Sequence, residues 1–179
     1  MYERKVYGTD YFDWARREAQ WGSVNETKKN LLQVAHSHAG GVRHYPKGAF
    51  VLNMLKNVVG GREAYNRGVK LYLNQHPYGN VDSDDLLYAF HESRGMSLNW
   101  FWEQWIYRGG EPSYNVTASD ITESGKRMTR VYVEQVHETN DVVGLFKMPI
   151  WFEVYYTDGT SSKIMKWVEE KSTFVDIPN

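Results

Sequence analysis

Residues 97–116 read SLNWFWEQWIYRGGEPSYNV, and the hydrophobic pattern of the chain changes within this stretch. Before it, apolar residues recur at spacings of three and four, which is typical of amphipathic helices. After Pro112, apolar and polar residues alternate, which is typical of strands with one buried face. The sequence therefore predicts a multi-domain α+β protein, with an all-helical part at 1–112, a boundary at 109–113 and a small antiparallel β-sandwich at 113–179.

The limits of the expected helices come from capping residues, glycines and one proline. Thr9 or Asp10 can cap a first helix, and a less regular stretch is expected to follow it. Pro46 fits the first turn of the next helix, where its missing N–H costs nothing. Ser83 and Ser97 are expected to cap the last two helices. The expected helical ranges are, in order, 9–20, 46–59, 62–75, 83–95 and 97–108.

About five strands are expected in the second part. Alternation is clearest at 131–135 and at 150–156. Asp158 and Gly159 stand between two apolar runs, and this pair tolerates the positive φ angles of a tight turn. The sequence therefore predicts a β-hairpin around these two residues.

Composition excludes several classes of function. The chain has 21 Lys and Arg against 22 Asp and Glu, a formal charge of -1, so nucleic acid and anionic membranes are not expected partners. It contains no cysteine, which excludes disulfides and thiolate chemistry. No stretch approaches the roughly 20 apolar residues that span a bilayer, and no basic segment followed by an apolar run stands near the start. The sequence as given is expected to be soluble, and it does not indicate a compartment.

Aromatic residues are unusually frequent, at 15% of the chain. Both a large core and a substrate cleft would produce such a composition. The run Trp100 to Trp105 could stack on a ligand, but its helical spacing favours a place in the core.

The sequence lacks the H-E-x-x-H motif, in which two histidines one helical turn apart bind zinc and the glutamate acts as general base. His91 precedes a glutamate, but Gly95 stands where the second histidine is needed. His137 also precedes a glutamate, and there Asp141 occupies that place. No serine-hydrolase elbow and no glycine-rich phosphate loop occurs either.

The histidines nearest to one another in sequence are His36, His38 and His44. Imidazole is a common metal ligand, so these three could form a zinc site. The alternative interpretation is a polar loop without metal, and the sequence favours this alternative.

The stretch HYPKGAFVLNML, residues 44–55, closely resembles the tyrosine-containing helix of the aminopeptidase N and leukotriene hydrolase family of gluzincin metallopeptidases. Its core is Y-x-K-G. Further matches follow in the order of that family, from the helices into the sandwich. They are Gly61, Tyr65, Tyr72-Leu73, His76, Asp84-Asp85-Leu86, Trp100 to Ile106, Gly110-x-Pro112, Tyr114-x-Val116, 131–135, Phe146-x-Met148-Pro149-Ile150 and Asp158-Gly159.

The resemblance implies a role for Tyr45. In this family zinc activates water and polarises the scissile carbonyl, while a tyrosine hydroxyl donates a hydrogen bond to the developing oxyanion. Tyr45 matches that tyrosine, and the resemblance implies a peptide substrate for the whole enzyme. Lys47 is expected to face solvent or a carboxylate, and Gly48 to permit close helix packing.

The resemblance also implies that the zinc ligands and the general base lie before residue 1, and that the last sandwich strands lie beyond Asn179. This chain alone is therefore expected to bind no metal, to be inactive and to self-associate through surface that other segments would cover. Whether it counts as an enzyme stays open at this point. The alternative function is a peptide-binding or scaffold module of the same fold without catalysis.

Overall fold

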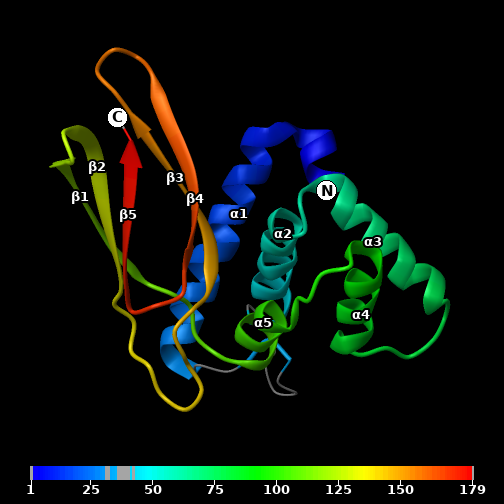
Figure 1. Ribbon diagram of the computed structural model, residues 1–179. Coiled ribbons are helices and arrows are strands. Elements are labelled where there is room, and N and C mark those ends of the chain that lie inside the picture. Colours follow the sequence, from blue (N-terminus) through cyan, green and yellow to red (C-terminus); the bar gives the residue numbers. More distant parts are fainter. Residues whose placement is uncertain (1, 31–32, 36–40, 42, 179) are drawn as a thin grey trace. The chain divides into compact units, whose positions relative to one another are not determined.

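The computed structural model describes residues 2–30, 33–35, 41 and 43–178 (Figure 1). The chain divides into two compact units, Met1–Gly110 and Glu111–Asn179. The first unit contains helices and the second contains antiparallel strands, which confirms the predicted α+β class with a helical part followed by a sandwich. Within the part that the structure describes, no helix is both long and apolar enough to cross a membrane.

The first helix, α1 (Tyr2–Asn30), is longer than the sequence predicts. Its backbone is interrupted at Gly8, with φ 88°, so a new helical run begins near the expected Thr9. The predicted end near Gln20 is wrong. The hydroxyl of Ser23 donates to the carbonyl of Ala19 at 2.8 Å, so this polar residue is satisfied inside the helix and does not end it.

The predicted helix from Pro46 has two parts. A π-helical turn, η1 (Arg43–Lys47), contains Pro46 and leads directly into α2 (Gly48–Val58). The helix α3 (Arg62–Gln75) has the bounds that were expected from the glycines before it.

The helix α4 (Ser83–Arg94) lies beside α3 (Figure 1). Asp82 caps it, not Ser83 as the sequence suggested. The Asp82 carboxylate accepts hydrogen bonds from the N–H groups of Asp84 and Asp85, while the Asp85 side chain accepts from the N–H of Asp82. This reciprocal pair satisfies more helix-end donors than a serine one residue later could. The helix ends at Gly95, as predicted, in the left-handed conformation.

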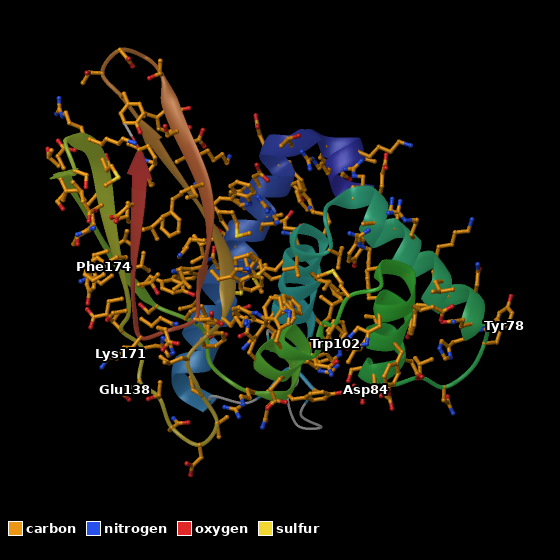
Figure 2. All side chains as sticks on the ribbon, viewed as in Figure 1. Tyr78, Asp84, Trp102, Glu138, Lys171 and Phe174 are labelled. Atoms are coloured by element: carbon orange, nitrogen blue, oxygen red, sulfur yellow. The ribbon has the colours of Figure 1, made fainter. Side chains whose placement is uncertain are left out.

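The last helical segment is short and ends in a second π-helical turn. It consists of α5 (Asn99–Trp102) and η2 (Glu103–Tyr107). The predicted cap at Ser97 is wrong, because the N-cap residue is Leu98 and its own N–H donates to Nε2 of His91 at 2.8 Å. Trp102 is 2% exposed and its indole donates to the carbonyl of Ser83 (Figure 2). Trp105 is buried as well, which confirms the core interpretation of this aromatic run.

The second unit contains five strands in two antiparallel sheets. The first sheet has the order β1-β2-β5, and the second pairs β3 with β4. The strands are β1 (Tyr114–Glu123), β2 (Lys126–Gln135), β3 (Met148–Tyr155), β4 (Ser161–Val168) and β5 (Ser172–Pro178). Asp158 and Gly159 connect β3 to β4 in the predicted hairpin, with Gly159 at φ 87°.

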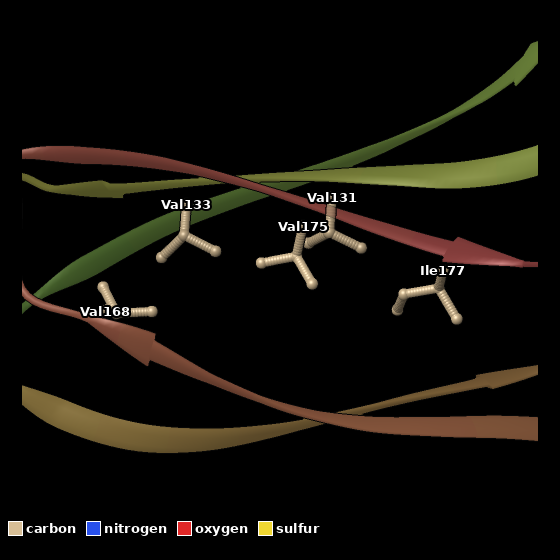
Figure 3. Close-up of a cluster of buried hydrophobic side chains, with 5 residues drawn as sticks. All are labelled: Val131, Val133, Val168, Val175 and Ile177. Atoms are coloured by element: carbon tan, nitrogen blue, oxygen red, sulfur yellow. The ribbon is translucent and has the colours of Figure 1, made fainter. Parts of the chain in front are cut away.

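Buried aliphatic side chains fill the space between the two sheets (Figure 3). In the first sheet Val131 stands opposite Val175, and both lie in this core. The core residues are Val131, Val133, Val168, Val175 and Ile177. Because alternate residues of a strand face the same side, the period-two pattern seen in the sequence places these side chains together.

Gln135 is the last residue of β2, and its polar side chain is buried, with 1% of its surface exposed. Its amide nitrogen donates to the carbonyls of Phe146 and Glu170, and its amide oxygen accepts from the N–H of Phe146. All of these groups lie where the chain leaves or re-enters the sheets. A single side chain thus forms hydrogen bonds with backbone groups of two loops.

Tyr114 packs against the core between the sheets, and no described residue accepts or donates a hydrogen bond at its hydroxyl. Burial raises the pKa of Tyr114 to about 12. A hydroxyl removed from water without a partner lowers the stability of the folded state. Ionisation of the same hydroxyl is even less favourable there.

Replacing the hydroxyl in Tyr114→Phe is therefore expected to raise the free energy of unfolding by about 1 kcal/mol near pH 7. An unfolded tyrosine ionises near pH 10, so folding stability of the unsubstituted chain should fall as pH rises from there towards the folded-state pKa. The variant should lack this part of the decline. Urea unfolding near pH 7 and about pH 11 measures both effects, with the exposed Tyr155→Phe as control. A variant less stable than the unsubstituted chain near neutral pH would contradict the account.

Candidate functional site

Tyr45 lies in the π-helical turn η1, which ends directly before the first residue of α2. Its N–H donates to the carbonyl of Gly41 at 3.2 Å. Pro46 follows it and has no N–H to place in the turn. Single π-helical turns are rare in proteins, but those that occur are often found at functional sites. Such a turn rotates the side chains that follow it relative to a regular helix.

The side chain of Tyr45 is 74% exposed. The ring of His44 lies edge-on against it, with 5.5 Å between the ring centroids. Among the described residues, none forms a hydrogen bond with the Tyr45 hydroxyl. The phenol is therefore free to donate a hydrogen bond to another molecule, which is the property that an oxyanion donor needs.

Lys47 does not face solvent, one of the two environments expected from the sequence, because it is 3% exposed. Its Nζ donates to the carbonyl of Gly110 at 3.0 Å. The long aliphatic stem of lysine can be buried at little cost when the ammonium meets polar partners. This contact connects the turn that carries Tyr45 to the last residue of the helical unit, 63 positions later in the chain.

The contact of Lys47 should stabilise the fold measurably. In Lys47→Met the carbonyl of Gly110 loses this donor, so the free energy of unfolding is expected to fall by about 1–3 kcal/mol. Urea unfolding followed by circular dichroism measures the change. The matched control is Lys70→Met, which removes an exposed lysine from α3. Equal stability of the two variants would show that the buried ammonium contributes nothing to the fold.

Gly48 is not required for close packing, contrary to the sequence-based interpretation. A Cβ built there lies 3.8 Å from the nearest side-chain atom, Cγ1 of Val34, which is an ordinary contact. The glycine at a tight helix contact is Gly68, where a Cβ would lie 2.4 Å from the ring of Phe90. Close approach therefore occurs between α3 and α4 and not at the start of α2.

The two histidines that precede glutamates have structural partners. His91 accepts the N–H of Leu98, as described above. His137 accepts the N–H of Ser113 at Nδ1, 3.5 Å away, which leaves Nε2 to donate to the carbonyl of Gly144 at 3.0 Å. Both rings are therefore held by backbone groups in their own units.

The residues that the structure describes do not fit a zinc ion. Among them, no three His, Cys, Asp or Glu side chains gather in a way that could hold a metal. Of the three clustered histidines, His36 and His38 lie outside the described residues, and His44 is exposed beside Tyr45. A zinc site formed by these three histidines stays a hypothesis.

Residues 23–105 match the model of the Peptidase family M1 domain, and Tyr45 and its turn lie within this range. The chain is related to the M1 peptidases. This finding confirms the family resemblance that the sequence motifs indicated.

Relatives with similar sequences have names that refer to a protease-interacting factor or to an aminopeptidase. The chain is 31% identical over 122 residues to "Tricorn protease-interacting factor F2" of Thermoplasma volcanium, a match that covers 68% of this chain and 15% of that protein. It is 39% identical over 99 residues to "Aminopeptidase N" of Streptomyces lividans, covering 54% of this chain and 11% of the relative. The chain thus spans about a seventh or less of the length of these relatives.

A solved structure shares the fold. The aminopeptidase A of Legionella pneumophila, determined in complex with aspartic acid, matches 92% of this chain and 20% of its own, with a TM-score of 0.63 and 16% identity. At this level of identity the match concerns the fold. It supports the succession of helices and antiparallel sheets described above.

Proposed function

We propose that this chain is part of a zinc-dependent aminopeptidase, in which Tyr45 donates a hydrogen bond to the oxyanion of the transition state. One observation supports this role most strongly. The Tyr45 hydroxyl is exposed and without a partner among the described residues, on a turn anchored by the buried Lys47, inside the range that matches the M1 domain. A phenol stays protonated near neutral pH, so it can donate throughout the reaction.

In such an enzyme, zinc and Tyr45 have different roles. Zinc, when bound, supplies Lewis acidity and an activated water. The motif H-E-x-x-H, which would hold it, does not occur in these 179 residues, so we place metal binding and the general base in other segments of the enzyme. Tyr45 contributes orientation and one charge-stabilising hydrogen bond. The chain alone is then an incomplete site for a peptide substrate.

The role of Tyr45 is testable in a protein that carries this chain together with an H-E-x-x-H zinc site. Tyr45→Phe is expected to lower kcat by about a hundredfold to a thousandfold with little change in KM, because the hydroxyl acts on the transition state. The measurement is steady-state hydrolysis of a panel of aminoacyl-4-nitroanilides. Tyr78→Phe is the control, since Tyr78 projects from the loop between α3 and α4 (Figure 2).

Two results would refute the catalytic proposal. The first is a Tyr45→Phe variant whose kcat stays within about twofold of the parent value. The second is peptide binding without hydrolysis by the metal-loaded protein. That second result would favour the alternative function, a peptide-binding or scaffold module of the same fold.

We also propose that the chain self-associates through α1. Aromatic side chains of this helix are exposed, with Trp14 at 56% and Trp21 at 70%. Tyr7, Tyr11 and Trp14 form successive ring contacts along it. Tyr11 and Trp14 stand three residues apart in the run after Gly8, which places them on one face of that run, and exposed apolar faces promote association.

Sedimentation velocity at increasing concentration tests this association. The sedimentation coefficient of the unsubstituted chain is expected to rise with concentration, and that of Trp14→Glu to rise less. The control Trp151→Glu changes a similarly exposed tryptophan of the sandwich unit. A compact monomer at every concentration would rule out self-association.

A further inference from the structure

Two adjoining cavities of the helical unit lie between α1 and the helices α2 and α3. The larger has a volume of about 300 Å³ and the smaller about 150 Å³. Phe12, Ala49 and Asn53 line both of them, so the two cavities form one groove. A volume of this size suits a small organic molecule.

Cations surround this groove. Arg4, Lys56 and Arg62 line the larger cavity, which has no carboxylate in its lining, and Arg16 lines the smaller one. We call the surface formed by these four side chains with Phe12 and Ala49 the basic groove. Asp13 is the carboxylate that forms an ion pair with it, through Arg16 at 2.7 Å.

Among the described residues, the hydrogen-bond donors of the basic groove have few acceptors. Nζ of Lys56 donates to a neutral oxygen, Oδ1 of Asn53, at 3.0 Å. Nε of Arg16 is buried, and no described residue accepts a hydrogen bond from it. For Arg4 and Arg62, the described residues provide no ion-pair partner. An unmet buried donor beside uncompensated charge is unfavourable until an acceptor arrives.

The electrostatics of Lys56 agree with this arrangement. Its pKa is lowered, first by partial burial and then by the neighbouring guanidinium groups of Arg16, Arg4 and Arg62, against which only Asp13 acts in the opposite direction. Positive charge therefore repels positive charge in the groove. An anion bound among these groups would remove that repulsion.

The apolar lining indicates what the anion is attached to. Phe12, Ala49 and Leu52 provide hydrocarbon surface next to the cations. We propose that the basic groove binds a small organic anion, a carboxylate or phosphate carried on an apolar or aromatic stem. The anionic group lies among Lys56, Arg62 and Arg4, where planar guanidinium groups can donate two hydrogen bonds each, and the stem lies against Phe12. This site is independent of the role proposed for Tyr45.

Calorimetric titration of the 179-residue chain with three probes tests the proposal. 3-Phenylpropionate carries a carboxylate, phenyl phosphate carries a phosphate, and 3-phenylpropanamide has the same stem without charge. At least one anion is expected to bind about tenfold or more tightly than the amide. Binding of only one of the two anions identifies the preferred headgroup. Equal binding of all three probes, or binding of none, would overturn the proposal.

Matched substitutions locate the site. Arg62→Gln is expected to weaken binding of the anion by about tenfold, because it removes one charge-assisted contact. Arg67→Gln makes the same charge change on an exposed residue of α3 outside the groove and should leave binding unchanged. Arg62 is exposed at the first position of α3, so its removal should not impair folding, and Arg4→Gln provides a second variant from α1. An equal effect of Arg62→Gln and Arg67→Gln would mean that the anion responds to net charge and not to the groove.

Discussion

The buried hydrogen bond from Lys47 to the carbonyl of Gly110 determines how the helical unit presents its candidate catalytic residue. Tyr45 and Lys47 stand two positions apart in one π-helical turn, and one is exposed while the other is buried. An ammonium needs polar partners when it is removed from water, so its position is more restricted than that of an apolar side chain. Fixing Lys47 inside therefore helps to keep Tyr45 outside. The exposure of Tyr45 thus depends in part on the buried contact between Lys47 and the carbonyl of Gly110.

Much of the fold could be predicted from local patterns. The bounds of α3 and the hairpin at Asp158 followed from glycines and turn residues, since these features depend on backbone conformations that few other residues adopt. The two-part organisation followed from the change of hydrophobic period. Periodicity reports which face of an element is buried, and in the sandwich unit the strand faces that it indicated form the core.

The failures concern features that depend on tertiary partners. Ser97 was expected to cap a helix, but His91 from another helix satisfies the N–H at its start. Lys47 was expected to face solvent or a carboxylate, and its burial depends on a partner distant in sequence, the carbonyl of Gly110, 63 residues away. The end of α1 was missed because Gly22 lies within the helix, where a single glycine costs only about 1 kcal/mol. In the candidate site, the motif singles out Tyr45 as a prediction, whereas the buried contact of Lys47 and the basic groove depend on residues that are distant in sequence.

The interruption of α1 at Gly8 has a consequence for molecular recognition. Arg4 belongs to the short run before Gly8, while Phe12 and Arg16 belong to the run after it. The positive φ of Gly8 sets the angle between the two runs, and a residue with a Cβ would be strained in that conformation. The φ angle of Gly8 therefore helps to set the distance between Arg4 and Arg16 across the groove. The dimensions of a ligand that could bridge them depend on a residue that has no side chain.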